Sequence, residues 1–119
     1  YSFSVFLKQG EYSRVRVQMG LDTGTAGEQL AFFDLNLADG SIGSMFTPGN
    51  GITIDAFGTI PYGNGWYRAF ITGTFSFGFG EIRTQLYVRN AAGDEVYAGD
   101  GTSGVYAWGM KLFKGVTFY

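Results

Sequence analysis

The chain has 119 residues, the size of one ordinary domain, and its eight basic and ten acidic residues give a net charge of −2. This balance argues against a nucleic-acid binder held by bulk charge, and no apolar run is long enough to span a bilayer. Cysteine and histidine are absent, which excludes disulfides, thiolate metal sites and the usual general base near neutral pH.

The apolar residues of the chain recur with a period of two, which is typical of half-buried antiparallel strands. The alternating stretches are 1–8, 13–20, 31–37, 52–57, 66–75, 82–89 and 105–112. Residues 28–37 also fit a helical stripe, but the pair Phe32 and Phe33 and the following Asp39-Gly40 favour a strand. We therefore expect an all-β, antiparallel domain over residues 1–119, built as a two-sheet β-sandwich or a barrel.

Tight turns are predicted where a residue that tolerates positive φ precedes glycine. These sites are Asp39-Gly40, Asn50-Gly51, Asn64-Gly65 and Asp100-Gly101. The chain begins without Met inside an expected strand, so we expect it to be a module of a longer multidomain protein.

The alternation assigns some aromatic residues to the core face of their strand and others to the outer face. Tyr67, Tyr106 and Trp108 share their faces with apolar residues, so we expect them in the core. Phe32, Phe57 and Phe70 fall on outer faces, which predicts that loops cover them. The series Phe75, Phe77 and Phe79 is either an exposed apolar rim or a kinked strand.

All five arginines lie inside expected strands and alternate with apolar neighbours, so each is expected on an outer face. They are Arg14, Arg16, Arg68, Arg83 and Arg89, and their outward companions are Gln18, Trp66, Gln85 and Tyr87. Sugars suit this combination, because aromatic rings stack on their C–H faces while Arg and Gln bond their hydroxyls. We take these nine as candidate ligand-binding residues; if their strands are neighbours, the arginines form a positive patch that favours uronic or sulfated sugars.

Two other uses of the charged residues stay open. The arginines also fit solvent-facing pairs across strands with Asp34, Asp55 and Glu81, which are themselves formal candidates for a glycosidase carboxylate pair. No other catalytic signature is present, so we do not expect an enzyme. Asp94, Glu95 and Asp100 bracket an expected short strand and are candidates for a structural Ca²⁺ site, although turn-forming Asp beside Gly explains them as well.

Four segments of the chain resemble a known family: YSFSVFLKQG (1–10), AFFDLNLADGSIG (31–43), YGNGWYRAFITGTFS (62–76) and YAGDGTSGVYAWGMKL (97–112). They look like a module of phage tail fibres and tailspikes, similar to carbohydrate-binding modules appended to glycoside hydrolases. The resemblance implies a jelly-roll-like β-sandwich with a glycan on its concave sheet. The residues that the resemblance repeats look mainly like scaffold: Gly65, Trp66, Tyr67, Arg68, Gly99, Asp100, Gly101, Tyr106, Trp108 and Gly109. Met110-Lys111 stands where the family usually has Ala-Gln. The strand with Arg83, Gln85, Tyr87 and Arg89 is not a fixed feature of the family, so these four residues are the better candidates for determining which ligand this chain binds.

The sequence as a whole therefore predicts a non-catalytic carbohydrate-binding module that recognises a polysaccharide on one sheet face. Its expected setting is extracellular or virion-associated, without nucleic-acid or membrane partners. The alternative is a structural or oligomerisation module of a tail fibre or other virion protein. A weaker alternative is a glycosidase remnant.

Overall fold

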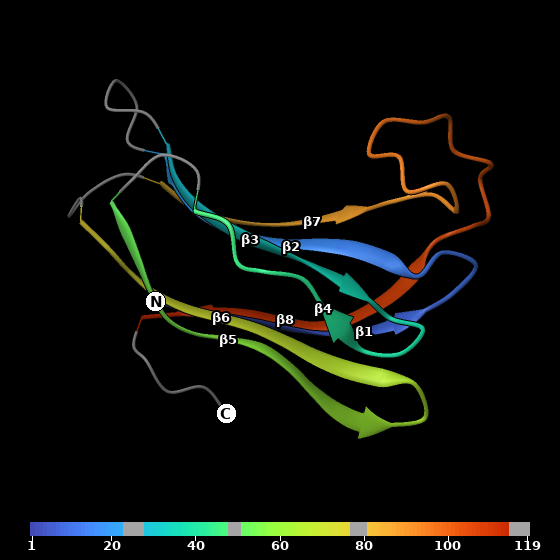
Figure 1. Cartoon of the computed structure of the whole chain (residues 1–119), viewed down its shortest axis with the longest axis horizontal. Coiled ribbons are helices and arrows are strands. Elements are labelled where there is room, and N and C mark those ends of the chain that lie inside the picture. Colours follow the sequence, from blue (N-terminus) through green and yellow to red (C-terminus); the bar gives the residue numbers. More distant parts are fainter. Residues whose placement is uncertain (23–27, 48–50, 77–80, 115–119) are drawn as a thin grey trace.

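The computed structural model describes residues 1–22, 28–47, 51–76 and 81–114, which form eight strands (Figure 1). The strands are β1 (Ser2–Gln9), β2 (Arg14–Asp22), β3 (Glu28–Asn36), β4 (Ser41–Ile42), β5 (Ile52–Gly63), β6 (Trp66–Phe75), β7 (Glu81–Val88) and β8 (Val105–Phe113). Within these ranges no helix has the length and apolar character needed to cross a membrane.

The strands form two four-stranded antiparallel sheets that lie one above the other (Figure 1). Sheet A has the order β5-β6-β1-β8, and sheet B has the order β4-β3-β2-β7. The expected all-β, two-sheet sandwich is thus confirmed, and eight strands in two sheets is the strand count of a jelly roll. Residues 28–36 form a strand, as their Phe-Phe pair predicted.

One apolar core fills the space between the two sheets. Alternate residues of β1, β2 and β3 supply most of it: Phe3, Val5, Leu7, Val15, Val17, Met19, Phe33 and Leu35, all of them buried. Ala69 and Ile71 of β6 complete the floor on the side of sheet A. The predicted alternation is confirmed for these strands, and the residues between the core positions lie on the two outer faces.

The connection between β5 and β6 is a two-residue turn made by Asn64 and Gly65. Both residues have positive φ, 55° and 82°, which is the geometry of a type I′ hairpin turn. Asn-Gly is the dipeptide that this turn prefers, because it requires left-handed backbone at both positions. The predicted turn is confirmed, and it brings the end of β5 next to Trp66.

Three β-bulges interrupt the pairing of sheet A and change which side chains face the core. The register of β5 against β6 shifts at Asp55 and again at Tyr62. The prediction that Phe57 lies outside is therefore wrong: after the bulge at Asp55 its ring packs 5.5 Å from that of Phe33 in the core. A bulge moves every following residue to the opposite face.

The third bulge lies in β8, where Gly109 and Met110 together face Val5 of β1. Gly109 has a φ of 62°, a left-handed conformation that glycine adopts without strain. The expectation that Tyr106 and Trp108 belong to the core is wrong, because the first half of β8 turns Val105 inward and these two rings outward. Tyr67, by contrast, packs against the core as expected.

The outer faces also settle two predictions about phenylalanine. Phe32 is covered as expected, since Phe46, from the segment after β4, stacks on it at a ring distance of 5.4 Å. Phe75 packs against the core and Tyr1, so it is no exposed rim residue. Phe77 and Phe79 lie outside the described residues.

Candidate functional site

The outer face of sheet B, the side turned away from sheet A, carries seven of the nine candidate ligand residues. They are Arg14, Arg16 and Gln18 on β2, Arg83, Gln85 and Tyr87 on β7, and Arg89 directly after β7. The strand pairing puts Arg16 opposite Tyr87 and Gln18 opposite Gln85. The condition that their strands are neighbours is therefore met for β2 and β7.

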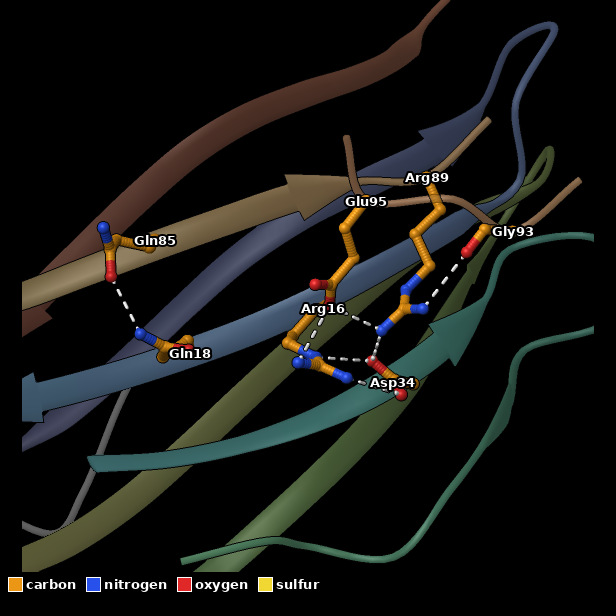
Figure 2. A network of polar contacts seen from close by, with 7 residues as sticks. All are labelled: Arg16, Gln18, Asp34, Gln85, Arg89, Gly93 and Glu95. Atoms are coloured by element: carbon orange, nitrogen blue, oxygen red, sulfur yellow. Dashed lines mark hydrogen bonds and ion pairs between the residues drawn. The ribbon is translucent and has the colours of Figure 1, made fainter. Parts of the chain in front are cut away.

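Two of these arginines are held in a network with carboxylates (Figure 2). Arg16 lies 3.0 Å from Asp34 and 2.9 Å from Glu95, and the hydrogen bond with Asp34 is the main cause that raises the pKa of Arg16. Arg89 lies 2.9 Å from Glu95 and 3.6 Å from Asp34, and also donates to the carbonyl of Gly93. Two positive and two negative charges therefore neutralise one another on this face.

Three further candidate side chains of sheet B have polar partners. Gln18 donates to the side-chain oxygen of Gln85 at 2.8 Å, as Figure 2 shows, and Arg83 lies 3.6 Å from Glu81. Arg14 lines a hollow of about 350 Å³ that also contains Asp34 and Arg89. The cross-strand alternative is thus confirmed for Arg16 with Asp34, which face each other on β2 and β3. Glu81 lies on the same strand as Arg83, and Asp55 accepts a hydrogen bond from Thr74.

The other two candidates, Trp66 and Arg68, lie on the far side of the sandwich, because β6 belongs to sheet A. Arg68 is only 5% exposed; it donates to Ser4 and lies 5.5 Å from the ring of Phe6. Trp66 stands at the start of β6 opposite Lys8. The nine residues therefore cannot form a single site, since they occupy the opposite outer faces of two sheets.

The outer face of sheet A instead has an open groove lined by aromatic rings, with a volume of about 410 Å³. We call it the aromatic groove, and its residues are Phe6, Tyr62, Gly63, Asn64, Trp66 and Trp108. Phe6 lies at its centre, with Tyr62 edge-on at 4.9 Å and Trp108 tilted at 5.4 Å between ring centroids. Tyr62 is 53% exposed and Trp108 is 67% exposed, so both rings are open to solvent.

Two of the β-bulges build this groove. Tyr62 is the extra residue in β5 between the pairs of Pro61 and Gly63, and Gly109 directly follows Trp108. Bulges redirect side chains and concentrate near binding sites. Sequence reasoning missed Tyr62 and Trp108; the one local signal was Gly109 in an otherwise apolar alternation, because glycine inside a strand often marks a bulge.

The acidic candidates are held apart. Asp34 is bound by Arg16 and Arg89 on sheet B, whereas Asp55 bonds Thr74 on sheet A. Of the proposed calcium ligands, Glu95 is paired with arginines, and Asp100 accepts from Thr102 and Ser103, which lowers its pKa to about 2. Asp94 bonds the amide of Asn90, and no group of three His, Cys, Asp or Glu with metal-site geometry occurs among the described residues.

Comparisons with protein-family models, with curated proteins and with solved structures find no match to this chain. The resemblance to a phage tail module therefore stays a prediction from the four sequence segments.

Proposed function

We propose that the protein is a non-catalytic carbohydrate-binding module and that a glycan binds in the aromatic groove of sheet A. The observation that carries the proposal is the groove itself, in which Tyr62, Trp66 and Trp108 present rings beside the amide of Asn64. Sugar rings have C–H faces that stack on aromatics and hydroxyls that bond amide groups. A groove of about 410 Å³ is in the range of small-ligand sites.

The rigidity of the sheet supports the same function. Phe6 and Trp108 are paired across β1 and β8, and Trp66 begins β6 directly after the type I′ turn. Rings fixed on strands lose little freedom when a ligand arrives, which lowers the entropic cost of binding. Such a module would serve an extracellular or virion-associated protein that holds polysaccharide.

The experiment is a titration of the protein against a panel of soluble polysaccharides, followed by calorimetry. We expect Trp108→Ala and Trp66→Ala each to weaken binding at least tenfold. Tyr87→Ala, which removes an exposed ring from sheet B, is the matched control and should change affinity less than twofold. Binding to no polysaccharide, or loss of binding only in Tyr87→Ala, would refute the proposal.

A structural role in self-association is the second candidate, and the surface of β8 favours it. This edge strand of sheet A carries four exposed large apolar residues: Tyr106, Trp108, Met110 and Leu112. An uncovered edge strand with apolar side chains is a template for pairing with another chain. Sedimentation analysis separates the two functions: an oligomer that dissociates in Met110→Glu and binds no glycan supports the structural role.

A further inference from the structure

The outer face of sheet A has a positive balance of charge although the chain as a whole is acidic. By strand register, its described cations are Lys8, Arg68 and Lys111. Its one described carboxylate is Asp55, which bonds Thr74 near the opposite end of the strands from Trp66. Charges at such a separation are largely screened in physiological salt, where the Debye length is about 8 Å. A nearer carboxylate is Glu11, in the segment after β1, which lines a hollow with Tyr106, the residue opposite Lys8. Cations therefore outnumber carboxylates on this face.

Lys8 lies beside the aromatic groove, two residues beyond Phe6 on the same outer face, although it is not one of the residues that line the groove. It occupies the central strand β1, with Trp66 opposite it on β6 and Tyr106 opposite it on β8. Its stem packs on the Asn64-Gly65 turn, where Cε is 3.5 Å from the position that a Cβ on Gly65 would take. A lysine stem that packs on a turn keeps its ammonium group at the solvent boundary.

The ammonium group of Lys8 is available to a ligand. Throughout ranges 1–22, 28–47, 51–76 and 81–114, every ion pair of the structure involves an arginine, and Lys8 takes part in none of them. Glu11, which follows β1, accepts a hydrogen bond from the backbone of Gly104 instead. Lys8 thus differs from Arg16 and Arg89, whose charges are already matched by carboxylates.

We infer that the ligand of the aromatic groove is an acidic glycan, whose sugars carry carboxylate or sulfate groups, and that Lys8 pairs with that anionic group. The inference rests on the proposed function. The sugar ring stacks on Trp66 or Trp108, and its negative substituent meets the ammonium of Lys8 beside the groove. A neutral glycan would gain the stacking but leave this charge without a partner.

Matched pairs of polysaccharides test the inference. Polygalacturonate is compared with its methyl ester, and dextran sulfate with dextran, so that each pair differs in charge and the two pairs separate carboxylate from sulfate. We expect at least tenfold tighter binding to the acidic member of one pair. Lys8→Gln should remove most of this preference and leave binding to the neutral member unchanged, with an unaltered melting temperature.

Two control variants show that the effect belongs to the groove. Lys111→Gln removes the same charge from the same face about 13 Å further along, because Lys111 lies opposite Ser4, and should change the preference less than twofold. Trp108→Ala should weaken binding to both members of a pair. Equal binding of acidic and neutral members, or an unchanged preference in Lys8→Gln, overturns the inference and leaves the proposed function standing. Failure of the wild type to bind any polysaccharide, in these pairs or in the wider panel, overturns both.

Discussion

The two outer faces of the sandwich carry similar residue types but use them differently. On sheet B the arginines lie between carboxylates, and Arg16 additionally covers the ring of Phe32 at 4.1 Å. On sheet A the rings of Tyr62 and Trp108 lie open, and Lys8 has no carboxylate partner in the described part of the chain.

The difference shows that an exposed position is not the same as an available one. A guanidinium that is already bonded to two carboxylates must lose those contacts before it can bind a sugar, and this loss offsets the gain. An exposed ring gives up only water when a sugar stacks on it. The number of arginines on a face therefore says less about ligand binding than whether each arginine is already paired with a carboxylate.

The largest expected effect comes from removing the floor of the aromatic groove. Phe6→Ala deletes contacts with both Tyr62 and Trp108, so we expect a loss of about 2–3 kcal/mol in the free energy of unfolding, less than for a fully buried ring. Glycan affinity should fall as well. Phe32→Ala on sheet B is the control, since it removes a covered ring and should lower stability alone. Urea unfolding and calorimetry measure both quantities, and unchanged affinity in Phe6→Ala would contradict the proposed site.

A smaller effect is expected at the bulge that turns Trp108 outward. A Cβ at position 109 would lie 3.3 Å from Cδ2 of Phe6, on a backbone with a φ of 62°. Gly109→Ala should therefore cost about 1–2 kcal/mol of stability and weaken glycan binding. Gly99→Ala is the control, because no atom of the described residues, apart from its two chain neighbours, lies within 4 Å of its added Cβ. Equal stability of the two variants in urea would show that the bulge does not depend on glycine.

The fold could be predicted because its strands β1, β2 and β3 are regular. Phe3, Val5 and Leu7 alternate without a bulge in β1 itself, so their burial follows from the period of two. The predictions failed at Phe57 and Trp108, where an extra residue in the strand reverses the faces. Alternation within one strand does not reveal such an insertion, because it is defined only against the partner strand.

The site could be predicted only in part, for a different reason. The outward direction of Arg16 and Arg68 is a local property, but the sheet to which each strand belongs is not. The assignment of β6 to sheet A separates Arg68 from the other arginines. Glu95 reaches Arg16 from the segment after β7, a contact that no spacing in the sequence indicates.

Removing the carboxylates that pair with the arginines of sheet B would test directly why we expect ligand binding on sheet A and not on sheet B. We expect the double variant Asp34→Asn with Glu95→Gln to lower stability by about 1 kcal/mol, since these ion pairs are partly exposed. It should also gain weak binding of dextran sulfate that disappears at high salt and persists when Trp108 is replaced by Ala. Asp55→Asn, which removes a carboxylate of sheet A, is the control and should create no such binding on sheet B. If the double variant does not bind the anion, the pairing of the arginines with Asp34 and Glu95 is not what prevents anion binding on sheet B.

The smallest expected effect concerns Asp100, in the loop that leads into β8. The hydroxyl of Ser103 and the backbone N–H groups of Ser103 and Thr102 bond its carboxylate and lower its pKa to about 2. A carboxylate whose pKa falls on folding stabilises the folded state above its ordinary pKa, and this contribution is lost as the pH falls toward about 2.

The stability difference between the wild type and Asp100→Asn should therefore narrow as the pH is lowered from about 5 to about 2. The group is fully exposed, so we expect a change of only a few degrees in melting temperature. Titration of the Asp100 carboxyl by NMR gives the direct measurement. A midpoint near the ordinary value of 3.8 would show that the hydrogen bonds of this loop do not hold the carboxylate.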